Sequence, residues 1–115
     1  MSVERLRRRK DIQQLFLNGS VVSSKVALIR YAFTDLPVAR AAIAPGKRLD
    51  KRAVVRNRIR RRIREALRTL PIMKKLDFVI VPRQHAINLG PIEIAQLLRQ
   101  MFEKAGLLEK DDIHD

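Results

Sequence analysis

The segment 53–70 constrains the fold most, because it interleaves apolar residues and arginines at helical spacing and contains neither glycine nor proline. On a helical wheel of about 100° per residue, the apolar side chains form one continuous stripe: Val55, Ile59, Ile63, Ala66, Leu67 and Leu70. The opposite side is polar and carries Asn57, Arg58, Arg60, Arg61, Arg64, Glu65 and Arg68, while Arg56 and Arg62 flank the stripe. The pattern predicts an amphipathic helix that packs on a core and points its arginines outward.

Short elements with clear boundaries surround this segment. Residues 11–18 are spaced as a helix, with Asp11 as its N-cap and Gly19 as its stop. Residues 23–33 and 38–44 favour two strands joined as a hairpin, and Pro45 should end the second strand early or place it at an edge or bulge. Residues 77–81 read as a buried strand, and residues 91–106 as an amphipathic helix that begins at a proline and ends at a glycine.

The charge of the chain is large and unevenly distributed. The 115 residues include 25 Lys and Arg against 12 Asp and Glu, which gives a net charge of +13. Residues 47–68 hold 11 of the 25 basic residues, whereas residues 91–115 hold six acids and three bases. We therefore expect one domain over residues 1–106 and an acidic, flexible tail over residues 107–115.

The outward arginines of this predicted helix need counter-charges from a partner. Residues 51–68 contain eight arginines and one lysine, with Glu65 as the only acid. Like charges at these helical spacings cost a few tenths of a kcal/mol per pair, and one glutamate cannot neutralise them. A solvated charged face is the ordinary alternative, but such faces mix glutamate with lysine. Arginine also suits bidentate phosphate contacts, so the pattern favours a nucleic acid.

Other classes of function lack support in the sequence. The chain has no cysteine, no apolar run near the ~20 residues of a membrane span, and no signal-like N-terminus. We expect a cytoplasmic protein with no membrane association. The two histidines, His85 and His114, and the scattered carboxylates form no local acid–base pair or metal-binding pattern. We therefore expect no catalytic residue, no bound metal and no cofactor in the polypeptide alone.

The sequence resembles a known family along most of its length. The stretch KRAVVRNRIRRRIREALR, residues 51–68, resembles the signature of the bacterial ribonuclease P protein subunit, with Arg56, Asn57 and Arg58 as its Arg-Asn-Arg triplet. The stretches RRRKDIQQLFLNGSVVSS, VALIRYAF, RAAIAPGKR and DFVIVPR resemble its first helix and three strands. Only the acidic tail lies outside the resemblance.

The resemblance implies an α+β sandwich of order αβββαβα, with a mixed sheet and a left-handed βαβ crossover that carries the arginine helix. It also implies a protein cofactor of an endoribonuclease, in which a catalytic RNA with bound Mg²⁺ removes the 5′ leader from precursor tRNA. The implied partners are this RNA and the leader, with no DNA, and with one protein monomer per RNA.

The resemblance further implies two RNA-contacting regions. The catalytic RNA would meet the arginine helix and its approach loop: Lys47, Arg48, Lys51, Arg52, Arg56, Asn57, Arg58, Arg60, Arg61, Arg64 and Arg68. A cleft between the first helix and the sheet would hold the leader through Arg9, Lys10, Ile12, Phe16 and Tyr31. Two departures affect these regions. Ile12 stands where the family usually has Phe, and Pro45-Gly46 replaces a β-branched and a small residue ahead of Lys47.

Three alternatives remain at this point. A ribosomal or other architectural RNA-binding protein would share the charge and the arginine helix. A stand-alone nuclease would need the cluster of His, Asp and Glu that is missing here. A helix-turn-helix DNA-binding protein would need a partner helix before the arginine helix, where strands are expected instead.

Overall fold

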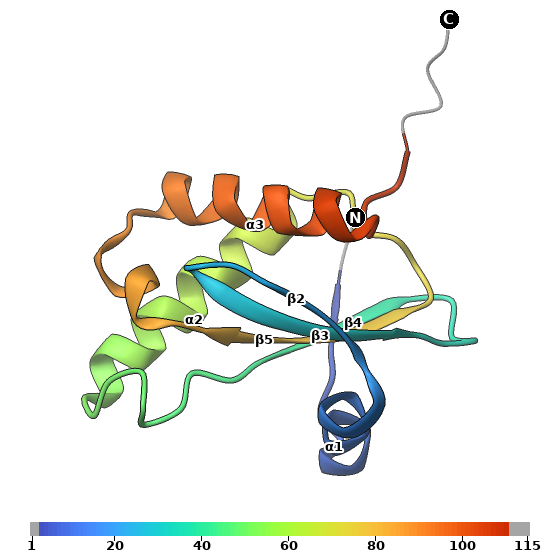
Figure 1. The fold of residues 1–115 in the computed structure, drawn as a ribbon, viewed down its shortest axis with the longest axis horizontal. Helices are drawn as coiled ribbons and strands as arrows, with labels where there is room; N and C mark the ends of the chain where they lie inside the picture. Colours follow the sequence, from blue (N-terminus) through green and yellow to red (C-terminus); the bar gives the residue numbers. More distant parts are fainter. Residues whose placement is uncertain (1–2, 111–115) are drawn as a thin grey trace, which may run out of the picture.

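A five-stranded mixed sheet in the order β1-β4-β5-β3-β2 separates two layers of helices in the computed structural model, which describes residues 3–110 (Figure 1). The strands are β1 (Glu4–Arg5), β2 (Ser20–Ser23), β3 (Ala27–Phe33), β4 (Ala39–Ile43) and β5 (Leu76–Pro82). The helices are α1 (Arg9–Asn18), α2 (Ala53–Arg68), the short 3₁₀ helix η1 (Gln84–Asn88) and α3 (Pro91–Ala105). The α+β class and the αβββαβα order are confirmed, with β1 and η1 as additions.

Strand β5 occupies the centre of the sheet, and the expected hairpin of residues 23–33 with 38–44 is wrong. β5 pairs antiparallel with β3 and parallel with β4, so it separates the two strands. Its residues from Leu76 to Ile80 are all buried. The most apolar strand is thereby covered on both faces, which an edge position could not provide. β4 and β5 are neighbouring parallel strands joined through α2.

The segment 23–33 forms parts of two strands instead of one. A tight turn follows Ser23, where the Ser24 backbone N–H donates to the Ala27 carbonyl at 2.9 Å and the Ser24 hydroxyl accepts from the Val26 N–H at 3.1 Å. β2 and β3 form an antiparallel hairpin around this turn. A serine that bonds its own backbone in this way favours a turn over a continuous strand.

The two faces of the sheet belong to separate apolar clusters. Ile29, Phe78 and Ile80 lie in the larger cluster with residues of α2 and α3. Val79 lies in a smaller cluster with Leu15 of α1. Since successive side chains of a strand point to opposite faces, α1 covers one face while α2 and α3 cover the other, as Figure 1 shows.

Helix α2 attaches to the larger cluster through the stripe expected from the sequence. All six residues of that stripe are buried: Val55, Ile59, Ile63, Ala66, Leu67 and Leu70. The prediction that this face packs on the core is confirmed. The arginines of α2 therefore emerge from the side of the helix that faces away from the sheet.

Several boundaries differ from expectation in instructive ways. α1 begins at Arg9, with Arg8 as its N-cap, so Asp11 lies inside the first turn and is not the cap. α1 ends at Gly19 as expected. β4 ends at Ile43, before Pro45, which confirms the early end that a proline predicts. Gly106 ends α3 at φ 72°, a left-handed conformation that glycine adopts without strain.

The packed domain continues beyond residue 106, so the expected start of the tail is wrong. Leu107 is 0% exposed and belongs to the larger apolar cluster. Leu108 forms a β-bridge with Ile72, and the Glu109 N–H donates to the Pro71 carbonyl at 2.7 Å. The rest of the proposed tail, residues 111–115 with His114, lies outside the described residues.

Candidate nucleic-acid interface

The α2 arginines form one outward surface, which we call the arginine face: Arg56, Asn57, Arg58, Arg60, Arg61, Arg64 and Arg68. Asn57, Arg61 and Arg68 are exposed, and the others are partly buried. Because the opposite side of α2 is anchored on the sheet, the arginine face is held in a fixed orientation. The structure thus brings together the helical part of the predicted RNA-binding set.

Few of these guanidinium groups have an acidic partner. Within residues 3–110, acidic side chains pair with Arg40, Arg52, Arg68 and Arg99. Arg58, Arg61 and Arg64 are left without one. The pKa of the Arg64 guanidinium lies below its usual value, because burial disfavours the charge and because Arg5, Arg60 and Arg68 repel it. The arginine face therefore has an unbalanced positive potential, which attracts anions.

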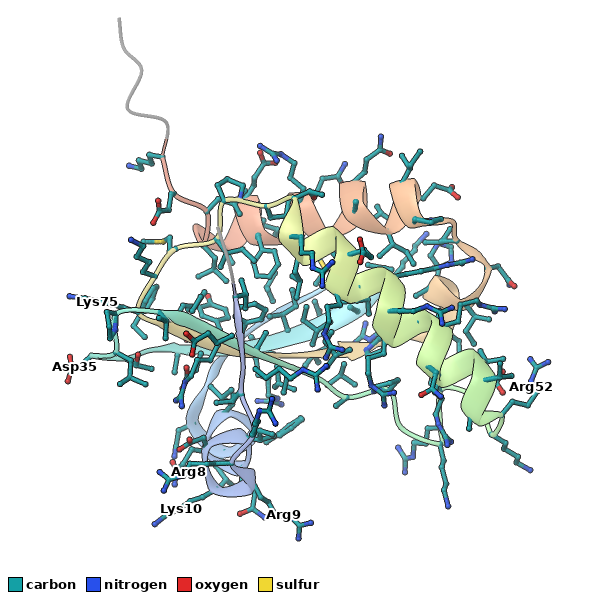
Figure 2. All side chains as sticks on the ribbon, turned by 180° about the vertical axis from the view of Figure 1, so that it is seen from behind. Arg8, Arg9, Lys10, Asp35, Arg52 and Lys75 are labelled. Atoms are coloured by element: carbon teal, nitrogen blue, oxygen red, sulfur yellow. The ribbon has the colours of Figure 1, made fainter. Side chains whose placement is uncertain are left out.

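The approach loop presents further basic side chains at the beginning of α2. Lys47, Arg48 and Lys51 are exposed, and Figure 2 shows Arg52 projecting from this end of the helix. Asp50 organises the loop by accepting the Arg52 backbone N–H at 2.8 Å and the Arg52 side chain at 3.0 Å. These bonds hold the pKa of the Asp50 carboxyl at about 2. The acid that the sequence placed among these bases is thus engaged by Arg52.

We expect the Asp50 carboxyl to titrate near pH 2, well below its ordinary value of 3.8. A depressed pKa in the folded state means that the loop bonds add stability above pH ~4 and lose it as the pH falls toward ~2. An NMR titration of the Asp50 carboxyl carbon measures this directly. Arg52→Gln should move the midpoint back toward 3.8. A midpoint near 3.8 in the unaltered protein would disprove the loop geometry.

The predicted leader cleft is not assembled as expected, because Phe16 and Tyr31 lie on opposite faces of the sheet. Tyr31 pairs across the strands with Phe78, packs against the larger apolar cluster, and makes an edge-on contact with Phe33 at 6.5 Å. That is the face covered by α2 and α3. The assignment of Tyr31 to a cleft beside α1 is therefore wrong.

Arg30, and not Tyr31, is the β3 residue whose side chain lies beside α1. It pairs with Val79, whose side chain lies in the α1 cluster, and its guanidinium carbon sits 5.7 Å from the centroid of the Phe16 ring. The Phe16 side chain is 43% exposed. The pair is a cation–π contact that leaves an aromatic surface open to solvent.

The remaining residues of the predicted cleft differ in where their side chains lie. Ile12 is partly buried in the α1 cluster, which is a packing role. Arg9 and Lys10 are exposed in the first turn of α1 and point away from the sheet in Figure 2. A hollow of about 170 Å³ lies between α1 and the sheet, and its lining includes Asp11 and Asp77.

An ion pair that the sequence did not indicate joins α1 to the sheet. The Arg40 Nε donates to Asp77 at 2.8 Å, and a second guanidinium nitrogen donates to the other carboxylate oxygen. Asp11 lies 3.7 Å from the same guanidinium. The hydrogen bond to Asp77 raises the pKa of Arg40. The cluster could not be predicted from the sequence, because its residues are far apart along the chain. Asp11 belongs to α1, Arg40 to β4 and Asp77 to β5.

The described part of the polypeptide shows no cluster of side chains suited to hold a metal ion. Within residues 3–110, no three His, Asp or Glu side chains gather to hold a metal ion. His85 is exposed on η1. None of the helices between residues 3 and 110 has the length and hydrophobicity to cross a lipid bilayer.

Comparison with known proteins finds one consistent family. The family model described as Ribonuclease P matches residues 1–106. The ribonuclease P protein component of Symbiobacterium thermophilum is 34% identical over 110 residues, covering 93% of this chain and 95% of that protein. The RNase P protein of Staphylococcus aureus superposes with a TM-score of 0.81 at 23% identity, covering 94% of this chain and 100% of that one. For the Thermotoga maritima protein the TM-score is 0.77 at 23% identity, with 87% and 96% covered.

Proposed function

The chain belongs to the bacterial ribonuclease P protein family, and we propose that it docks on the catalytic RNA of ribonuclease P and assists removal of the 5′ leader from precursor tRNA. Family membership makes it the protein component of a tRNA-processing ribonuclease, with an RNA subunit as its partner. The observation that best supports the docking role is the arginine face, whose cations other than Arg68 have no acidic partner within residues 3–110. Phosphate groups of folded RNA supply the missing counter-charges.

The docking we propose is electrostatic and depends on shape. Arg61 is exposed and takes part in no ion pair within the described residues, so it can contact phosphate without first breaking one. Arg60 is steadied by a 2.7 Å bond to the Asn57 side chain, and this holds its guanidinium in a defined position. Lys47, Arg48, Lys51 and Arg52 extend the same surface along the approach loop. A preformed array of this kind loses less entropy on binding.

For the leader, we propose the α1 side of the sheet, with Phe16 and Arg30 as its contacts. The partly exposed ring and the guanidinium above it can stack on an unpaired base, which is worth about 1 to 3 kcal/mol per base. Catalysis itself would reside in the RNA, with Mg²⁺ held by RNA phosphates and no protein side chain in contact with the scissile bond. We further propose one protein copy per RNA, acting in the cytoplasm.

A reconstitution assay tests the proposed function. Labelled precursor tRNA is incubated with the cognate catalytic RNA at low Mg²⁺, with and without the protein, and also with the protein alone. The proposal predicts that cleavage at the mature 5′ end is stimulated by the protein and absent when the protein is alone. Cleavage by the protein alone would indicate a nuclease. No stimulation would indicate an architectural RNA-binding protein.

Phe16→Ala should reduce discrimination between precursor and mature tRNA by roughly fivefold to 100-fold, which corresponds to the loss of one base stack. The measurement compares the affinity of the reconstituted complex for tRNA with and without a leader. Leu17→Ala is the matched control, because Leu17 is a neighbouring apolar side chain that is 75% exposed. Equal losses for both tRNAs would place Phe16 outside the leader site.

A further inference from the structure

Phe33 and two lysines form a patch at one end of the sheet, outside both the arginine face and the Phe16–Arg30 contact. We propose that this patch binds an unpaired leader nucleotide of precursor tRNA, farther from the mature tRNA than the nucleotides at Phe16. The proposal rests on the function proposed above and extends its leader site to the second face of the sheet. We call the feature the sheet-end patch and define it by four exposed residues: Phe33, Leu36, Lys74 and Lys75.

The Phe33 ring is an aromatic surface that the core does not use. Phe33 is 60% exposed and Leu36 is 42% exposed, whereas Phe78 and Phe102 are each 0% exposed. Tyr31 supports the ring from one side, with 6.5 Å between the ring centroids and 84° between the ring planes. Because a ring held by its neighbour needs little ordering on binding, it suits stacking on an unpaired base.

Phe33 is exposed because β3 extends past the end of the edge strand β2. The pairing of β2 with β3 ends at Ser20 and Tyr31, whereas the pairing of β3 with β5 continues to Phe33 and Leu76. Within residues 3–110, β2 is the outermost strand on this side of the sheet, so no strand covers the edge of β3 beyond Tyr31. An RNA strand can therefore pass around this edge from one face of the sheet to the other.

The last turn of α1, which carries Phe16, lies at the same corner of the molecule. α1 ends at Asn18, and Gly19 leads directly into β2. The Gly19 backbone packs so closely on β3 that a Cβ atom there would lie 3.2 Å from the Tyr31 carbonyl oxygen. Phe33 lies on the other face of this corner, because its side chain points to the same side as Tyr31. A leader that contacts Phe16 can thus continue around the corner to Phe33.

Lys75 has a backbone conformation that glycine adopts more easily. Its φ of 61° lies in the left-handed region, and no other residue except glycine has a positive φ between residues 3 and 110. The Lys75 N–H donates to the Val38 carbonyl at 3.1 Å, and the Lys75 carbonyl accepts the Thr34 N–H at 2.9 Å. Figure 2 shows the Lys75 side chain projecting from this end of the molecule. Since the backbone alone favours glycine here, the presence of lysine indicates a role for its ammonium group.

The charge and position of the sheet-end patch favour the leader over the catalytic RNA. No ion pair among residues 3–110 involves Lys74, Lys75 or Asp35, which Figure 2 places at the same end as Lys75. The two lysines and one acid leave a small positive charge beside an exposed ring. A single strand offers base faces as well as phosphates, whereas folded RNA offers mainly phosphates. Arg52, at the beginning of the arginine helix, lies at the opposite end of the molecule in Figure 2.

Precursor tRNAs with a series of leader lengths test the proposal, when bound to holoenzyme reconstituted from the full-length protein and the cognate catalytic RNA. We expect Phe33→Ala to weaken binding of long-leader tRNA by roughly fivefold to 100-fold, the effect of one lost base stack. Binding of tRNA with a short leader or none should be unchanged. Ile92→Ala is the matched control, because Ile92 is an apolar side chain of α3 that is 74% exposed. It should change binding at no leader length.

Lys75→Gly distinguishes a binding role for this lysine from a structural one. Glycine adopts the observed φ without strain, so the variant should unfold at the same urea concentration as the unaltered protein or at a higher one. Its binding to long-leader tRNA should nevertheless weaken. The slope of log affinity against log salt should fall by roughly 0.7, for one lost contact with single-stranded phosphate. Unchanged affinity and slope would overturn the lysine contact.

Phe16→Ala separates failure of this inference from failure of the proposed leader site, because shorter leaders should reach Phe16 than reach Phe33. If Phe16→Ala weakens leader binding while Phe33→Ala behaves like Ile92→Ala at every length, the sheet-end patch is not a leader site and the proposed function stands. If neither variant changes leader binding, both leader contacts fail. If Phe33→Ala weakens only assembly with the catalytic RNA, or changes only self-association of the protein in sedimentation, the inference is overturned.

Discussion

Replacing Arg61 and Arg64 together by glutamate should reduce affinity for the catalytic RNA by more than about 100-fold at moderate salt, while the fold remains intact. Each side chain can make a charged hydrogen bond worth about 1.5 to 3 kcal/mol, and the reversed charges also repel phosphate. Neither residue belongs to the buried stripe of α2. Filter binding with the cognate RNA measures the affinity, and circular dichroism measures the fold.

The matched control for this double reversal is Arg99→Glu with Lys104→Glu, which removes the same net charge from the exposed side of α3. A general attraction between a basic protein and RNA would respond equally to both double variants. The arginine face predicts a large loss for the α2 variant and a small one for the α3 variant. Equal losses would show that net charge, and not the position of the arginines, drives binding.

Ile59→Ala should destabilise the protein by about 2 to 5 kcal/mol, the usual cost of truncating a large buried aliphatic side chain. Ile59 is 0% exposed and sits in the middle of the stripe that holds α2 on the sheet. A loss of this size is a large part of the roughly 5 to 15 kcal/mol that stabilises a typical domain. Urea unfolding followed by circular dichroism gives the free energy of unfolding.

Val54→Ala is the control within the same helix, because Val54 is also β-branched and apolar but is 71% exposed. Its effect should stay within about 0.5 kcal/mol. At temperatures where the Ile59→Ala protein is still folded, its affinity for RNA should match that of the unaltered protein. Similar losses of stability in the two variants would mean that α2 is not anchored through its apolar stripe.

The helices could be predicted from the sequence because their signals are local. The stripe from Val55 to Leu70 and the spacing of α3 each repeat over several turns, and the structure buries both as expected. The order of the strands could not be predicted in the same way. Nothing local to residues 38–44 shows that β5, more than 30 residues later, pairs with them. β1 spans only two residues, too few to display a period.

The arrangement of the arginine face was predicted better than the arrangement of the residues around Phe16, for the same reason. The arginine face comes from one helix, whereas the α1 side of the sheet draws on α1, β3, β4 and β5. In β3, Arg30 and Tyr31 are neighbours in sequence, and a shift of one residue moves a side chain to the other face. Ala27, Ile29 and Tyr31 alternate along β3 and so share one face, while Arg30 points to the other. This alternation was the signal that could have corrected the assignment of Tyr31 to the cleft beside α1.

Other contacts left no pattern in the sequence. The Arg40–Asp77 pair joins β4 to β5. Arg5 and Arg64 line the same hollow only because β1 pairs with β4. The sequence predicted that an acidic tail begins at Leu107. In the structure Leu107 is buried in the core, just after the left-handed conformation of Gly106. Contacts of this kind depend on the topology of the sheet and on the direction of the chain after a helix, and neither is encoded in local spacing.

The position of the arginine face against RNA can be read directly from tethered cleavage. The chain has no cysteine, so Glu65→Cys on α2 and Glu103→Cys on α3 each offer one attachment site for an iron chelate that generates hydroxyl radicals. The two positions are matched, because both side chains are more than half exposed and each pairs with an arginine on its own helix. We predict strong, localised cleavage of the catalytic RNA from position 65 and little from position 103. Equal cleavage from both, or cleavage only from position 103, would contradict docking through α2.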